Sequence, residues 1–162
     1  MRTRFIARTI GALIALLLLV FLPLPAQTPT EYQPVGNMSQ LMINILYPTS
    51  NAIFYIERNA PKSDSEWSLV QDQALMLAES GNLLLMPGRA RDQAGWVKDA
   101  KLLIDAGNAA YKAAKAKDMP AILALNDQLN TACVSCHEDY RPAYRKRRQQ
   151  NQEKQNQEQN KQ

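Results

Sequence analysis

The sequence predicts an all-α fold, a single antiparallel four-helix bundle. Prolines divide the central part of the chain into four segments of roughly 22 to 32 residues. Within each segment apolar residues recur every three or four positions, as they do on one face of a helix. No stretch alternates polar and apolar residues in the manner of a strand. The dividing residues are Pro34, Pro61, Pro87, Pro120 and Pro142.

The first segment lies between the first two of these prolines. Its apolar face comprises Met38, Leu41, Met42, Ile45 and Leu46. Pro48 removes one backbone hydrogen bond, and its ring clashes with the preceding turn, so we expect a kink or a break there. The apolar residues that follow the proline are Ile53, Phe54 and Ile56.

The second and third segments have a start signal and a close-packing face. Residues 63–66 (Ser-Asp-Ser-Glu) have the pattern of a capping box, which begins a helix. The apolar face of this second helix comprises Trp67, Val70, Ala74, Leu77 and Ala78. The face of the third comprises Trp96, Ala100, Leu103, Gly107, Ala110 and Ala114. Its small residues allow another helix or a flat ligand to approach closely.

The fourth segment brings together the two cysteines and the only histidine of the chain. Asp118 is a favourable N-cap, and Pro120 falls in the first turn. Residues that step by three or four share one helix face. On this helix they are Ile122, Leu125, Leu129, Cys133, Cys136 and Tyr140. His137 follows Cys133 by four positions, so both thiols and the imidazole are expected to point into the bundle.

The two ends of the chain differ from this central part. Residues 1–26 combine three arginines, an apolar run and a break ending in Ala26, which predicts a cleaved signal peptide and a periplasmic protein. An uncleaved anchor is the alternative, although the run is shorter than the ~20 residues of a membrane span. Residues 145–162 form a polar, Gln/Asn-rich tail without an apolar residue, which predicts disorder. The domain therefore comprises residues 27–144.

The distribution of charge argues against a nucleic-acid partner. The full chain has a formal net charge of +4, and removal of the three arginines of residues 1–26 leaves +1. Residues 145–162 hold six basic and two acidic residues, so the domain itself carries −3. A basic tail on an acidic domain is not the basic binding face of a nucleic-acid-binding protein. The cluster Arg145–Arg148 is either solvated or in weak contact with an anionic membrane surface.

Cys133, Cys136 and His137 have the C-x-x-C-H spacing of covalent haem attachment. Two thiols one helical turn apart can each form a thioether with one haem vinyl group, and the next residue can ligate the iron. A structural zinc site needs four ligands, and a thioredoxin-type C-x-x-C accompanies a βαβ unit. A disulfide across two residues would constrain little of the unfolded chain. The motif therefore predicts one covalently attached haem c.

A C-x-x-C-H on the last helix of a four-helix bundle resembles the class II cytochromes c. This family includes cytochrome c′ and its low-spin, methionine-ligated relatives. The block "CVSCHEDYRP" and the preceding "AAKAKDMPAILALNDQLNTA" carry the resemblance, which extends over residues 36–145 and is strongest in the last helix. It implies that Cys133 and Cys136 hold the haem and that His137 is the proximal iron ligand. Arg141 matches the basic residue that the family often has four positions after this histidine.

The resemblance also implies that the first helix covers the distal side of the haem. Met42 is the expected second iron ligand; Met38 or an open position is the alternative. Of the other methionines, Met86 adjoins a loop, Met76 is expected in the core and Met119 in a loop.

Two functions follow from these alternatives. An electron carrier with a redox partner protein is expected if a methionine binds the iron. A five-coordinate protein that binds nitric oxide or carbon monoxide is expected if Met42 or Leu41 only plugs the distal side. An enzyme is not expected, because the chain has no second histidine. The family often pairs through its first two helices, and Ile53, Phe54 and Ile56 give more apolar surface than one buried face requires, so we expect a homodimer.

Overall fold

The computed structural model of the 162-residue chain describes residues 32–160. The predicted signal peptide, residues 1–26, and the start of the predicted domain lie outside this range. In the described range every regular element is a helix and no strand is present, which confirms the predicted all-α class. None of these helices has both the length and the apolar character of a membrane span.

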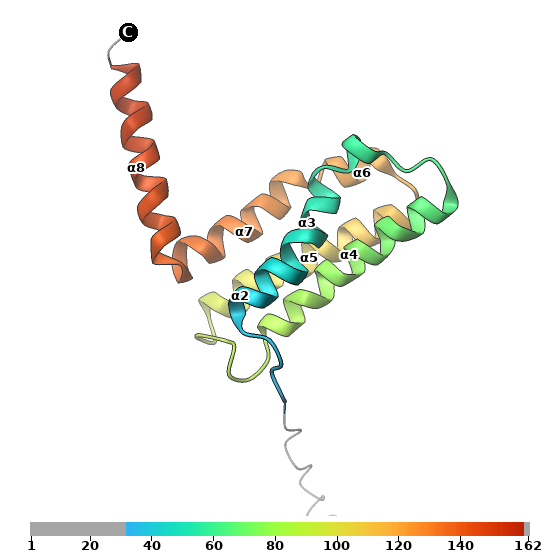
Figure 1. Ribbon diagram of the computed structural model, residues 1–162, viewed down its shortest axis with the longest axis horizontal. Helices are drawn as coiled ribbons and strands as arrows, with labels where there is room; N and C mark the ends of the chain where they lie inside the picture. The colour runs from blue at the N-terminus through green and yellow to red at the C-terminus, as the bar shows by residue number, and fades with distance from the viewer. Residues whose placement is uncertain (1–31, 161–162) are drawn as a thin grey trace, which may run out of the picture. The chain divides into compact units, whose positions relative to one another are not determined.

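The first helical segment runs from residue 38 to residue 54 without a break (Figure 1). It comprises helix α2 (Met38–Leu41), the π-helix η1 (Met42–Leu46) and helix α3 (Tyr47–Phe54), and the short 3-10 helix η2 (Ile56–Asn59) follows. Pro48 does not break the helix. The Tyr47 N–H bonds to the carbonyl of Met42, five residues back, and Pro48 lies in the first turn of α3, where its missing N–H is tolerated.

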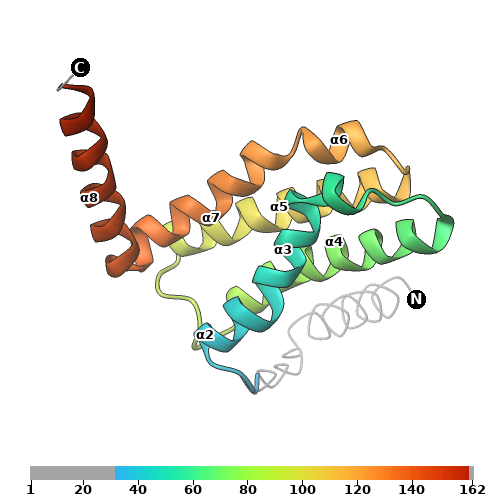
Figure 2. The same ribbon diagram turned by 45° about the horizontal axis from the view of Figure 1, so that its top comes forward.

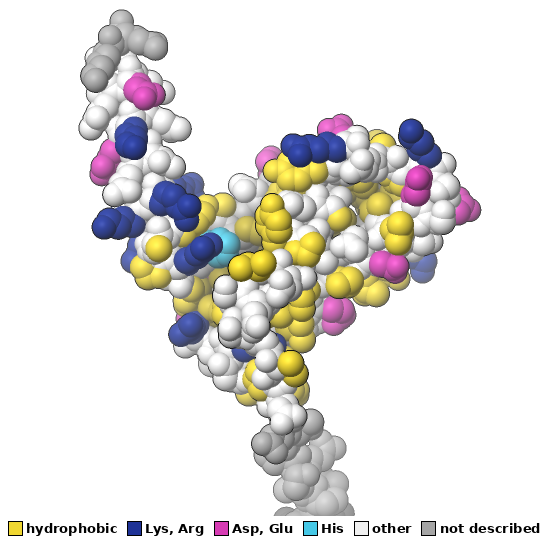
Figure 3. Space-filling model, viewed as in Figure 1, with side chains coloured by type: hydrophobic (Ala, Val, Ile, Leu, Met, Phe, Trp, Pro, Cys, Tyr) yellow, Lys and Arg dark blue, Asp and Glu magenta, His cyan; other side chains and the backbone are white. Residues whose placement is uncertain are grey.

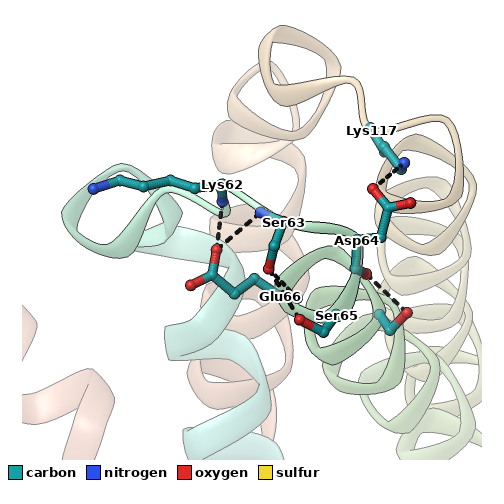
Figure 4. A network of polar contacts seen from close by, with 7 residues as sticks. Lys62, Ser63, Asp64, Ser65, Glu66 and Lys117 are labelled. Atoms are coloured by element: carbon teal, nitrogen blue, oxygen red, sulfur yellow. Dashed lines mark hydrogen bonds and ion pairs between the residues drawn. The ribbon is translucent and has the colours of Figure 1, made fainter.

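Helix α4 (Asp64–Leu84) begins at the predicted capping box. The Ser63 hydroxyl accepts a hydrogen bond from the Glu66 N–H at 3.3 Å, and the Glu66 carboxylate accepts one from the Ser63 N–H at 3.0 Å (Figure 4). The same helix start is tied to a distant part of the chain, because Lys117 Nζ lies 2.7 Å from a carboxylate oxygen of Asp64. The start of α4 is thus set by local sequence, as predicted.

Helix α5 (Gly95–Lys115) runs antiparallel to α4 and packs closely against it (Figures 1 and 2). The two helices approach each other closely at Gly107. A Cβ atom added there would lie 2.6 Å from the backbone nitrogen of Ala78 and 3.0 Å from its Cβ. The predicted small-residue face is therefore the face that α4 covers, and all its predicted members are buried.

The predicted fourth helix is interrupted. Helix α6 (Met119–Leu123) begins at Asp118, whose carboxylate accepts a hydrogen bond from the Ala121 N–H at 2.9 Å, as expected of an N-cap. At its end the Leu125 N–H bonds to the Ile122 carbonyl, three residues back, which makes a tight turn. Helix α7 (Asn126–Tyr140) then carries the cysteines and the histidine.

The chain continues as helix α8 (Pro142–Gln159), where the sequence predicts a disordered tail. Pro142 lies in the first turn, and the Gln, Glu, Lys and Arg side chains that follow favour helix. No residue of α8 is buried. The disorder prediction rested only on the lack of apolar residues that could be buried. It did not consider intrinsic helix propensity, which favours a helix in this segment.

The core lies among the first helical segment, α4, α5, α6 and α7. Its fully buried large apolar side chains are Ile53, Leu77, Ile122 and Leu129.

Ile53 and Ile56 are buried in this core, and Phe54 packs against it, so these residues do not form the surplus apolar surface that the dimer prediction assumed. Met76 is 47% exposed rather than in the core, and Met119 packs against the core rather than lying in a loop.

Candidate cofactor cavity

A cavity of about 460 Å³ opens among the first helical segment, α4, α5 and α7. Its size is within the usual range of small-molecule sites. The larger apolar side chains that line it include Leu46, Leu77, Leu84, Trp96 and Leu103. A cavity of this kind suits a large and largely apolar ligand.

All five predicted site residues line this cavity: Cys133, Cys136, His137, Arg141 and Met42. Four of them come from the second half of α7 and the residue that follows it, whereas Met42 comes from the first helical segment, about ninety residues earlier. The fold therefore brings the methionine to the same cavity as the thiols and the imidazole.

The alternative methionines do not line the main cavity. Met38 lines a smaller adjoining hollow of about 300 Å³, which shares Met42 and His137 with the main cavity. The sulfur of Met86 accepts a hydrogen bond from Arg89 Nη1 at 3.1 Å, and Met86 lines a third hollow together with Leu41. Met42 is thus the methionine that lines both the main cavity and the hollow beside it.

The two thiols are free and half-buried. Burial raises the pKa of Cys133 above its ordinary value. Burial, and then the nearby charge of Asp99, raise the pKa of Cys136 to about 11. Both groups are therefore protonated near neutral pH, which makes them weak nucleophiles and weak metal ligands as they stand.

His137 is half-buried at the mouth of the cavity, and Figure 3 shows the chain's only histidine at the surface beside basic side chains. Burial, and then the charge of Arg141, lower the pKa of His137 below its ordinary value. Its imidazole is therefore neutral near pH 7, and the neutral form is the one that ligates metals. Among residues 32–160, no group of three or more His, Cys, Asp and Glu side chains is placed to bind a metal ion directly.

Asp99 is the lining residue that the sequence interpretation missed. The residue is 2% exposed, and its Oδ1 accepts a hydrogen bond from the Ser135 hydroxyl at 2.7 Å. Oδ2 has no hydrogen-bond partner within the described residues. The sequence did contain a signal, because Asp99 follows Trp96 by three positions and so places a charge on the buried face of that helix.

Basic groups gather at one end of the site. Arg91, from the loop between α4 and α5, and Arg141 both line the smaller hollow, together with Ser39 and Tyr140. Arg91 was also missed, since a loop residue has no helical periodicity to reveal which way it faces. An apolar cavity with two guanidinium groups at its mouth suits a flat, apolar ligand with an anionic end.

No family model matches the chain, and no match was found among the curated proteins or the solved structures.

Proposed function

We propose that the chain is an exported monohaem c-type cytochrome that acts as an electron carrier. In this proposal the helices up to α7 form the four-helix bundle of the class II cytochromes c, with the haem attached to α7. One observation carries the proposal: both thiols, the imidazole and Met42 line a single apolar cavity. Two thiols followed directly by an imidazole are the residues that covalent haem attachment uses.

The residues present fit a covalently attached haem c. Cys133 and Cys136 would hold it through two thioethers, each made by adding an S–H bond across a vinyl group. His137 would ligate the iron with its neutral imidazole. Arg91 and Arg141 would bind the carboxylate end. When bound, the haem supplies a one-electron ferric/ferrous couple.

Met42 is the proposed second ligand. It lines the main cavity together with His137, whereas Met38 lines only the hollow beside it. Met42 also begins the π-helix η1, and π-helical turns occur frequently at functional sites. Ligation by histidine and methionine raises the reduction potential, which suits an electron carrier.

The alternative is a five-coordinate protein that binds nitric oxide or carbon monoxide. Ile43 and Leu46 also line the cavity from the first helical segment, so an apolar side chain is available to cover an open iron position. Leu41, the other predicted plug, is buried in the core and lines a different hollow.

Export would place the protein in the periplasm, where its partner would be a redox protein that gives or accepts one electron. The basic first turns of α8, with Arg145–Arg148, would meet an acidic partner or, more weakly, an anionic membrane surface.

The absorption spectrum of haem-loaded protein tests the choice between the two functions. We expect the ferric protein to be low-spin, with the weak charge-transfer band of a sulfur–iron bond. Met42→Ala should abolish that band and open the reduced protein to carbon monoxide, and Met38→Ala is the matched control that should change neither. A high-spin ferric wild type that binds carbon monoxide when reduced would favour gas binding instead.

A further inference from the structure

We infer that Asp99 is a buried negative charge that lowers the reduction potential of the group held in the cavity. The inference rests on the proposed function, which it extends by naming a residue that sets the redox property of the site. The juxtaposition that carries it is one carboxylate, deep in the fold, facing the cavity that the thiols and the imidazole share.

The hydrogen-bonding of Asp99 is incomplete. Ser135, on α7, donates to Oδ1 at 2.7 Å, and Oδ2 has no partner within the described part of the chain. A buried carboxylate with half its hydrogen bonds unmade is costly to the fold. A buried polar atom without a hydrogen-bond partner in a native protein needs an explanation, such as a functional role or a donor group on a bound ligand.

Asp99 differs from the other charged residues that line the site because it is buried, whereas they are exposed. Arg91 and Arg141 are exposed at the mouth, where water screens their charge. Asp99 lies on the buried face of α5, where the effective dielectric constant is low and a charge acts over a longer distance. Its charge already contributes, after burial, to the raised pKa of Cys136.

The sign of the effect follows from charge. A haem gains one positive charge when its iron is oxidised, so a fixed carboxylate stabilises the ferric form relative to the ferrous form. Removal of the negative charge should therefore raise the reduction potential. A residue with a purely structural role would change the stability of the fold and leave the potential where it is.

Potentiometric titration of the full-length haem protein tests this. Asp99→Asn keeps the shape and can still accept from Ser135, and Asp99→Ala removes the group altogether. At a fixed ambient potential we expect both variants to raise the ratio of reduced to oxidised protein at least tenfold, a shift of about 59 mV for one electron. Asp105→Asn, an exposed carboxylate on the same helix, is the matched control and should leave the ratio unchanged.

The outcomes separate the two proposals. If the wild type carries no covalent haem, the proposed function fails and the inference fails with it. If the haem is present and neither Asp99 variant changes the potential, or the shift has the opposite sign, only the inference is overturned. Failure of both Asp99 variants to fold, judged by circular dichroism, would assign Asp99 a structural role and also overturn it.

Discussion

The ring of Tyr144 lies edge-on to the imidazole of His137, with the ring centroids 5.3 Å apart and the planes inclined at 61°. Tyr144 belongs to the first turn of α8, and His137 to the last turn of α7. Arg148, one turn further along α8, forms an ion pair with Glu138. Helix α8, which has no buried residue, thus contacts α7 at His137, the proposed iron ligand.

Removal of the Tyr144 ring should loosen α8. Tyr144→Ala leaves Arg148–Glu138 as a half-exposed ion pair, and such pairs contribute only about 0–1 kcal/mol. We expect the backbone amides of residues 143–150 to exchange with deuterium several times faster, measured by mass spectrometry. Tyr144→Phe keeps the ring and should exchange like the wild type. Equal exchange in the alanine variant would show that this contact does not hold α8.

The contact between Tyr140 and Asp92 should make stability depend on pH on the acid side. Tyr140 donates a hydrogen bond to the Asp92 carboxylate and lowers its pKa, and the backbone N–H groups of Trp96 and Ala94 add to the effect. Because the folded pKa lies below the unfolded value, this stabilisation is present above the unfolded pKa of ~3.9 and is lost as pH falls through the folded pKa.

Tyr140→Phe removes the largest cause of that shift. Urea unfolding between about pH 2 and pH 7 should show a shallower loss of stability on the acid side than in the wild type. On the alkaline side, the bond to Asp92 is the first cause that raises the pKa of Tyr140, to about 12. The wild type should therefore lose more stability than Tyr140→Phe as pH rises from about 10 to about 12. Tyr111→Phe, a control on α5, should reproduce both wild-type slopes; an identical acid slope in Tyr140→Phe would contradict the prediction.

Gly107 should be intolerant of a methyl group. An added Cβ would lie under 3 Å from backbone atoms of Ala78, which cannot move without separating α4 and α5. We expect Gly107→Ala to lower the free energy of unfolding by about 1–3 kcal/mol, the usual cost of overpacking. Thermal or urea unfolding measures this. Asn108→Ala, at an exposed neighbouring position, is the control, and equal stability of the two variants would refute the close contact.

Local signals in the sequence predicted two of the helix starts. Ser63 and Asp118 cap α4 and α6 as their residue types require, and the apolar spacing placed Trp96 and Leu129 in the core. These features depend on residues within one or two turns of each other, which periodicity and capping rules describe.

Features that depend on distant parts of the chain were missed. The half-satisfied carboxylate of Asp99 is defined by a contact with another helix, and the docking of Tyr144 by a contact across the junction of α7 and α8. Before Pro48 the hydrogen bonding shifts to a π-helix, so the helix does not break there, and no single residue signals this shift. Ile53 and Ile56 are likewise buried because other helices cover them, which their spacing in the sequence does not reveal.

Pairing of two copies remains a prediction, now with a different surface. In the described part of the chain, the exposed large apolar side chains all lie between residues 32 and 76. Leu69 and Met76 are two turns apart on α4 and are 62% and 47% exposed. We expect sedimentation at micromolar concentration to show a dimer that the double substitution Leu69→Glu, Met76→Glu converts to monomer. Lys101→Glu on α5 should stay dimeric; a monomeric wild type would end this prediction.

Covalent attachment of haem is the central claim. The protein should be produced with a c-type assembly pathway and extracted with acidified acetone, which removes haem that is not covalently bound. We predict that haem stays on the denatured chain of the wild type, that Cys133→Ala and Cys136→Ala each leave one thioether, and that the double variant keeps none. Release of the haem from the wild-type chain into the acetone would contradict the account.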